Sequence, residues 1–151
     1  MQKPLDETNK AIIRSLTDGR KPYSAIAEAL NITENTVRAR VNRMVEEGIL
    51  QITGLINPDR IPGLQVVQLG VKLKTLDLER KAREFCHLRG VVSVTVVTGR
   101  YDLFVTLVLS DDEELSLLNF YKHELDQITE IAEVEAYVVC QGHNFRVPYI
   151  L

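Results

Sequence analysis

The chain has 151 residues, of which 45% are hydrophobic and 26% are charged, with 18 Lys and Arg against 21 Asp and Glu. This balance is typical of a folded globular protein, and it argues against disorder and against a uniformly basic coat for nucleic acid. The longest apolar runs fall far short of the roughly 20 residues that cross a bilayer, so we expect a cytoplasmic protein with no membrane partner. The acidity is C-terminal, because residues 1–60 carry nine basic and eight acidic residues whereas residues 61–151 carry nine and thirteen.

Three helices are predicted in the first part of the chain. Asp6 can cap the first helix, which we expect to end at Gly19 in a left-handed conformation. The second starts around Pro22 and ends at Asn31, since Asn tolerates a positive φ angle. Thr33 is then a good N-cap for a third helix, only two residues later. The residues that we expect on the inner face of this helix are Val37, Val41, Met44 and Val45.

The outer face of the third helix is polar, basic and rich in small residues. Three helices with a short turn before a basic third helix predict a helix-turn-helix, whose third helix can enter the DNA major groove. The competing interpretation is a small helical bundle whose arginines face water. Arg40 lies at the flank and could bind either DNA or an acidic residue of a neighbouring helix, whereas Arg43 lies nearer the centre. The candidate DNA-binding residues are Thr33, Asn35, Thr36, Arg38, Ala39, Arg40, Asn42 and Arg43.

A domain boundary is predicted just after this helix. Gly48 ends the helix, and the β-branched stretch 49–56 predicts a short strand or wing. Proline and glycine then interrupt the pattern, so we place a linker at 57–63 between a DNA-binding domain at 1–56 and a second domain at 64–151.

The second domain alternates strand and helix patterns. We expect strands at 67–73, 91–98, 103–109 and 131–140, with helices at 78–86 and after a capping box formed by Ser110 and Glu113. The order βαββαβ predicts a ferredoxin-like sandwich, so the fold class is α+β. One sheet face is left uncovered in this fold, and its apolar strands predict a homo-oligomer joined sheet to sheet. The tail at 141–151 has no clear periodicity.

The sequence holds no recognised catalytic or cofactor motif. The histidines are scattered, and no GxxxxGK or GxGxxG loop is present, so we expect neither an enzyme nor a cofactor. Cys86 and Cys140 lie far apart without CxxC spacing, which gives no support for a disulfide or a metal site. We expect both cysteines to be buried as small hydrophobic residues.

The residues, taken together, resemble the Lrp/AsnC family of regulators over nearly the whole chain. Asn42 departs from the family pattern, since a basic residue is usual there. The segments that carry the resemblance are Leu5-Asp6, Gly19-Arg20, Ile26-Ala27, Thr33, Thr36-Val37, Arg40-Val41, Arg43, Gly48-Ile49-Leu50 and Thr98-Gly99-Arg100-Tyr101-Asp102-Leu103.

The resemblance implies a regulator that binds double-stranded promoter DNA. It also implies dimers that are joined partly through the strand after the DNA-binding unit and that assemble into tetramers or octamers. In many relatives, a small amino acid binds between the C-terminal domains. The effector candidates are Gly99, Tyr101 and Asp102, where Gly99 could offer backbone amides to a carboxylate and Asp102 could accept from an ammonium. The competing interpretation is an ordinary hairpin turn. For the whole chain, the alternative function is a small-molecule-binding oligomer whose basic helix mediates protein contacts.

Overall fold

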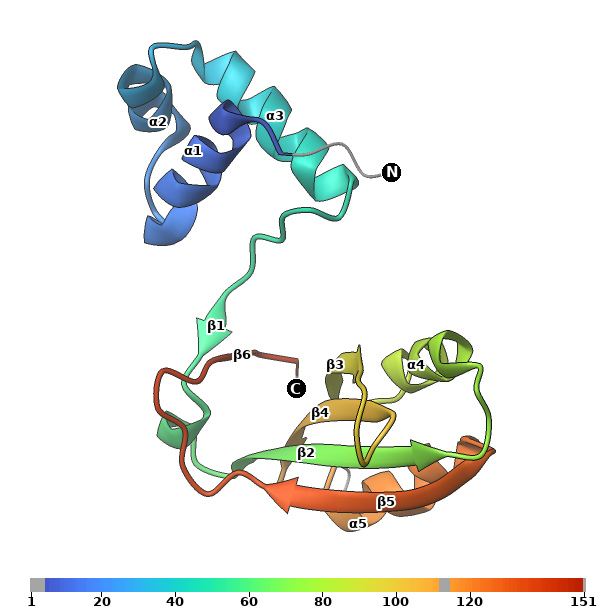
Figure 1. Cartoon of the computed structure of the whole chain (residues 1–151). Coiled ribbons are helices and arrows are strands. Elements are labelled where there is room, and N and C mark those ends of the chain that lie inside the picture. Colours follow the sequence, from blue (N-terminus) through green and yellow to red (C-terminus); the bar gives the residue numbers. More distant parts are fainter. Residues whose placement is uncertain (1–4, 112–114, 151) are drawn as a thin grey trace. The chain divides into compact units, whose positions relative to one another are not determined.

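The computed structural model describes residues 5–111 and 115–150. The chain forms two compact units, the first ending at Thr53 and the second beginning at Gly54 (Figure 1). The segment 57–63, predicted as a linker, lies in the second unit, where Pro58–Arg60 forms a 3-10 turn. Part of the predicted capping box, Glu113, lies outside the described residues.

The first unit consists of three helices, and the predicted caps fix the starts of the first and the third. They are α1 (Glu7–Ser15, followed by a 3-10 turn at Leu16–Asp18), α2 (Tyr23–Leu30) and α3 (Glu34–Glu46). Asp6 accepts a hydrogen bond from the Asn9 amide, and Thr33 accepts one from the Thr36 amide. Asn31 ends α2 with φ of 53°. The apolar faces of the helices meet in a core of Ile12, Ile26, Ala27, Val37, Val41 and Met44.

Two local expectations for the first unit are wrong. Val45 is 45% exposed, because it lies one position past Met44 and turns out of the core. Gly19 has φ of −18°, since the 3-10 turn rather than a left-handed residue ends the first helix. The short strand or wing expected within 49–56 is a strand at its very end: residues 49–54 form no strand, and β1 (Leu55–Ile56) pairs with β6 (Val147–Pro148) in the second unit.

The second unit is built on a four-stranded antiparallel sheet. In chain order its elements are β2 (Leu64–Leu73), α4 (Leu78–Cys86), β3 (Val91–Val96), β4 (Leu103–Ser110), α5 (Leu117–Asn119) and β5 (Ile131–Val138). A π turn at Phe120–Glu124 and a 3-10 turn at Leu125–Gln127 continue α5. The strand order β3-β4-β2-β5 confirms the ferredoxin-like α+β fold. The N-cap of α5 is Ser116, whereas Ser110 is the last residue of β4.

One face of the sheet packs against the helices. Val67, Leu69 and Val71 alternate along β2 and meet the buried rings of Phe85 and Phe120. The two cysteines are not part of this core, contrary to expectation. Both are exposed, since Cys86 follows Phe85 at the end of α4 and turns away from the sheet, and Cys140 lies beyond the end of β5.

The tail covers one end of the opposite sheet face. Val147 of β6 packs with Val66 and Val108, which are at most 3% exposed, and in Figure 1 β6 runs beside β1. The rest of this face stays open, with Phe104 42% and Tyr137 44% exposed. The tail, which has no sequence periodicity, is therefore ordered by packing on the sheet and by pairing with β1.

Candidate nucleic-acid interface

Helix α3 separates its buried and exposed residues cleanly. Val37, Val41 and Met44 are at most 1% exposed and hold the helix against α1 and α2. At its start, the hydroxyl groups of Thr33 and Thr36 lie 2.8 Å apart next to the free amides of the first turn, where the helix dipole favours an anion. The exposed side of α3 carries Asn35, Arg38, Ala39, Asn42 and Arg43.

Two arginines on the exposed side are paired with acids of the same helix or its C-cap. The Arg38 guanidinium donates to Glu34 at 2.7 Å and lies 5.5 Å from the centre of the Tyr23 ring. Arg43 donates to Glu47 at 2.7 Å, and its side chain is 72% exposed. Exposed ion pairs of this kind contribute about 0–1 kcal/mol, so a DNA phosphate can replace the carboxylate at little cost.

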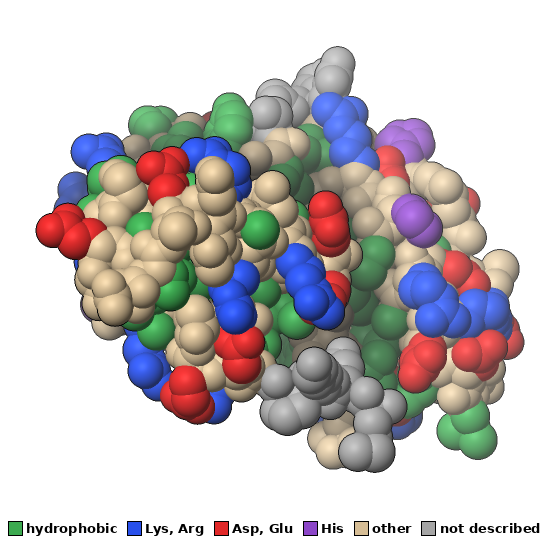
Figure 2. Space-filling model, turned by 90° about the horizontal axis from the view of Figure 1, so that it is seen from above, with side chains coloured by type: hydrophobic (Ala, Val, Ile, Leu, Met, Phe, Trp, Pro, Cys, Tyr) green, Lys and Arg blue, Asp and Glu red, His purple; other side chains and the backbone are tan. Residues whose placement is uncertain are grey.

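Basic and acidic side chains also lie close together elsewhere on the surface of the molecule. On the face seen in Figure 2, Lys and Arg side chains lie next to Asp and Glu side chains rather than forming one continuous basic patch. The cationic character of α3 is therefore local, as the near-neutral balance of residues 1–60 indicates.

Arg40 links two helices of the same unit. Its guanidinium donates to Asp6 at 2.7 Å and to Asn9 at 2.9 Å, and its side chain is only 35% exposed. The hydrogen bond from Arg40, together with the Asn9 amide, lowers the pKa of Asp6. Of the two roles considered for Arg40, the structure shows the contact with an acidic residue of a neighbouring helix, which ties the start of α1 to α3.

The candidate effector turn lies at the hairpin between β3 and β4. Gly99 has φ of 144° and leaves open space where a side chain would stand. The carboxylate of Asp102, however, is already bound: one oxygen accepts from the Lys72 ammonium at 2.7 Å and the other from the Leu73 amide at 2.9 Å. The Leu73 amide first, and then Lys72, hold the pKa of Asp102 below its usual value. An effector ammonium would have to compete with both contacts.

Tyr101 belongs to the turn, and its side chain packs on the open sheet face. It is 5% exposed, its ring packs over Gly70, and its hydroxyl donates to the Glu135 carboxylate. Arg100 donates to Glu133 at 3.0 Å and lies 5.1 Å from the centre of the Tyr101 ring.

The sequence analysis did not identify Glu133 and Glu135, which accept hydrogen bonds from Arg100 and Tyr101. Glu133 and Glu135 are more than thirty positions from Tyr101 along the chain, so no local motif joins them. Their spacing of two residues in β5, which places both side chains on one sheet face, was the available signal.

None of the described helices combines the length and the apolar character needed to cross a membrane. Within residues 5–111 and 115–150, no group of three His, Cys, Asp or Glu side chains is placed to hold a metal ion.

A helix-turn-helix unit followed by a ferredoxin-like domain defines a class of two-domain DNA-binding regulators. The sequence matches the AsnC-type helix-turn-helix domain over residues 5–45 and the Lrp/AsnC ligand binding domain over residues 66–145. The chain belongs to the Lrp/AsnC family of transcriptional regulators, which confirms the resemblance seen in the sequence.

Individual relatives agree with this assignment. The uncharacterized HTH-type transcriptional regulator PH0140 of Pyrococcus horikoshii is 34% identical over 137 residues, which cover 89% of this chain and 85% of the relative. The crystal structure of PH0061 superimposes with a TM-score of 0.80, covering 99% of this chain and 100% of the other at 24% identity. The transcriptional regulator NMB0573 of Neisseria meningitidis, solved in complex with L-Met, has a TM-score of 0.67 at 19% identity and covers 91% of each chain. At these identities the two structures show the shared fold alone.

Proposed function

We propose that α3 is the recognition helix and binds the major groove of promoter DNA in a sequence-specific way. The observation that carries this proposal is the division of α3 into a fully buried apolar face and an exposed polar face with two arginines. Arg can bind guanine edges or phosphates, and Asn can pair with adenine. Arg40 acts mainly by holding α3 against α1. The proposed contact residues are Thr33, Asn35, Thr36, Arg38, Ala39, Asn42 and Arg43, with Arg40 at the edge.

A mobility shift on the DNA upstream of the protein's own gene tests this function. Binding through phosphates releases counterions, so the logarithm of affinity should fall steeply with the logarithm of salt concentration. If the protein does not bind this DNA, or if its affinity does not depend on salt concentration, the alternative is favoured, in which the protein is a small-molecule-binding oligomer whose basic helix contacts protein. The protein would act in the cytoplasm, with access to the chromosome.

The open sheet face is the proposed surface of self-association. Phe104 on the inner strand β4 and Tyr137 on the edge strand β5 are large and exposed on this face, and a second copy of the face would bury them. Two-fold pairing would present two recognition helices to a roughly palindromic site with half-sites about one DNA turn apart. The proposed assembly is a dimer that forms tetramers or octamers.

Size-exclusion chromatography of a charged variant tests this surface. Phe104→Lys should shift the protein toward smaller species, because it places a charge at the centre of the interface. The matched control is Leu118→Lys, which changes a 62% exposed residue on α5, at the other side of the domain core. An unchanged elution volume for the Phe104 variant would contradict the proposed surface.

The proposed regulator is a small amino acid bound by the second unit. The match to a ligand binding domain and the L-Met complex of the Neisseria regulator support an amino-acid effector. The turn with Gly99, Tyr101 and Asp102 is the site that the family resemblance implies. Repeating the mobility shift with each of the twenty standard amino acids tests whether any of them changes DNA affinity.

A further inference from the structure

Three basic side chains of the first unit have no acidic partner. Arg14 lies near the end of α1, and Arg20 and Lys21 lie in the turn between α1 and α2. Arg14 and Arg20 are exposed and Lys21 is half-buried. Within residues 5–111 and 115–150, none of these three side chains makes a hydrogen bond or an ion pair. We call these three residues the turn cluster.

Every other basic side chain in the described part of the first unit is paired with an acid. The pairs, each with 2.7 Å between the nitrogen and the oxygen, are Lys10–Glu7, Arg38–Glu34, Arg40–Asp6 and Arg43–Glu47. All arginines of α3 are therefore neutralised by a neighbouring carboxylate. The unpaired positive charge of this unit is concentrated in the turn cluster.

The side chains of the turn cluster line a surface hollow of about 620 Å³. The same hollow is lined by Ser15, Thr17 and one acid, Asp18. Asp18 is the only acidic residue between Glu7 and Glu28, so positive charge is in excess here. Several cations and hydroxyl groups around one hollow suit the oxygen atoms of phosphate groups, because Lys, Arg, Ser and Thr side chains are the usual phosphate donors.

The turn cluster lies next to the exposed side of α3. Lys21 is followed by Pro22, the N-cap of α2, and by Tyr23, its first residue. The Arg38 guanidinium lies 5.5 Å from the centre of the Tyr23 ring, so the start of α2 borders the proposed DNA-binding face. Pro22 provides no side-chain acceptor for the first amides of α2, which leaves them open to an anion.

We propose that the turn cluster binds the phosphate backbone of DNA and supplies most of the salt-dependent affinity, whereas the arginines of α3 supply mainly sequence discrimination. A paired guanidinium that moves to a phosphate leaves its carboxylate behind, and this carboxylate binds a cation from solution. The net release of counterions is therefore smaller for a paired arginine than for an unpaired one. The inference rests on the proposed DNA binding and adds a second contact surface to it.

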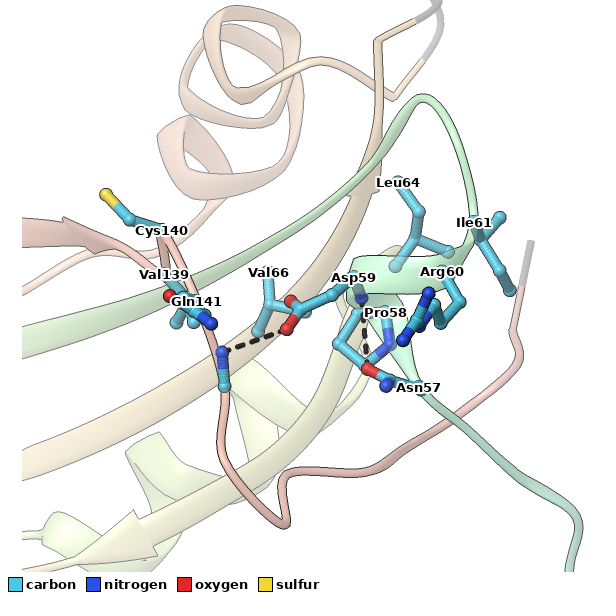
Figure 3. Close-up of a pocket in the computed structure, with 11 residues that line it drawn as sticks. Asn57, Pro58, Asp59, Arg60, Ile61, Leu64, Val66, Val139, Cys140 and Gln141 are labelled. Carbon is cyan, nitrogen blue, oxygen red and sulfur yellow. Dashed lines mark hydrogen bonds between the residues drawn. The ribbon is translucent and has the colours of Figure 1, made fainter.

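An unpaired arginine of the second unit provides the comparison. Arg60 is exposed, and among the described residues its side chain makes no hydrogen bond or ion pair. Figure 3 shows it at the 3-10 turn, next to Asp59, at the edge of a cavity of about 560 Å³. Of the described residues that line this cavity, Arg60 is the only basic one. It is thus a single cation beside an acid, and we expect no phosphate contact there.

Fluorescence anisotropy with the upstream DNA and with DNA of unrelated sequence, over a range of salt concentrations, tests the inference on the full chain. The triple variant Arg14→Gln, Arg20→Gln and Lys21→Gln should make the slope of log affinity against log salt shallower by about two to three per subunit. It should also weaken binding to both DNAs by the same factor, at least about tenfold. Arg43→Ala, by contrast, should lower the preference for the upstream DNA.

Two further variants keep this test independent of folding. Asp18→Asn should strengthen binding to both DNAs, because it removes the acid from the hollow while the Asp18 carbonyl, which accepts from the Arg20 and Lys21 amides, stays in place. Arg60→Gln is the matched control, and it should leave the affinity and the salt slope unchanged. The melting temperature of the triple variant should match that of the unaltered protein, since its three side chains make no contact that stabilises the fold.

The outcomes separate this inference from the proposed function. If the protein binds DNA but the triple variant keeps the full salt slope, or if Arg60→Gln reduces the slope equally, only the inference is overturned. If the unaltered protein does not bind DNA, both fail. Calorimetric titration with inorganic phosphate tests a free anion as the occupant. Tight phosphate binding that is lost in the triple variant, with an unchanged salt slope for DNA, would also overturn the inference.

Discussion

Replacing Arg43 with Ala removes the most exposed arginine of α3, the proposed recognition helix, and the structure sets the size of the expected effect. A side-chain contact with a base or phosphate contributes about 1–3 kcal/mol. To make that contact, Arg43 gives up its pair with Glu47, which is worth up to about 1 kcal/mol at 72% and 45% exposure of the two side chains. From the middle of each range, the net loss is about 1.5 kcal/mol per subunit, or about 10-fold in affinity.

Fluorescence anisotropy of a labelled promoter fragment, measured over a range of salt concentrations, checks this expectation. If Arg43 binds a phosphate, the slope of log affinity against log salt decreases by about one for each phosphate that the variant no longer neutralises. If it binds a guanine, the slope changes less and discrimination against a mutated site falls. Glu47→Gln is the complementary variant, and it should strengthen binding because it frees Arg43.

Stability and assembly should not change in the Arg43 variant. Ala has a high helix propensity, and the position is exposed, so the melting temperature and the elution volume should match those of the unaltered protein. An intact oligomer that binds DNA with unchanged affinity and an unchanged salt slope would refute the proposed orientation of α3.

Three further predictions concern stability. Asp6→Asn keeps a helix cap but weakens the pair with Arg40. Because the pKa of Asp6 is lowered in the folded state, its contribution to folding stability is present above about pH 4 and is lost as the pH falls. The melting temperature of the variant should therefore depend less on pH below about pH 4 than that of the unaltered protein. Lys81→Ala should cost about 3 kcal/mol in urea unfolding, since the Lys81 side chain is fully buried and hydrogen-bonded. Gly70→Ala should cost about 1–3 kcal/mol, because the new Cβ would lie 2.6 Å from the Tyr101 ring.

Two control variants distinguish the loss of the Lys81 and Gly70 contacts from a nonspecific loss of stability. Lys122→Ala removes an exposed lysine and should leave urea unfolding unchanged. Gly54→Ala adds a Cβ that meets nothing within 4 Å, so it should be neutral or slightly stabilising. If either control loses as much stability as its partner variant, the assigned contact is not the cause.

Local chemistry explains which parts of the fold can be predicted from the sequence. The caps at Asp6 and Thr33 and the left-handed Asn31 depend on residues within four positions, and the structure confirms all three. The alternation of apolar residues along β2 is also sufficient to predict this strand, because a strand with one face in the core buries every second side chain.

The errors arise where the deciding contact is distant in sequence. The β-branched stretch 49–56 predicts a short strand or a wing; only Leu55–Ile56 forms a strand, and its partner is in the C-terminal tail. Similarly, the partners of the Asp102 carboxylate, Lys72 and Leu73, lie on another strand, so no local motif indicates that this carboxylate is already bound. Spacing also misassigns Val45 and Cys86, since a helical pattern does not say where the apolar face ends.

The pairing of Arg38 with Glu34 and of Arg43 with Glu47 has a consequence for the search along the chromosome. When the helix meets a duplex out of register, these carboxylates remain close to the sugar-phosphate backbone and repel it. Only a register that satisfies both guanidinium groups compensates for this repulsion. If α3 binds DNA as proposed, the acids would thus shorten the residence time on random sequence and leave the lifetime on the operator largely intact.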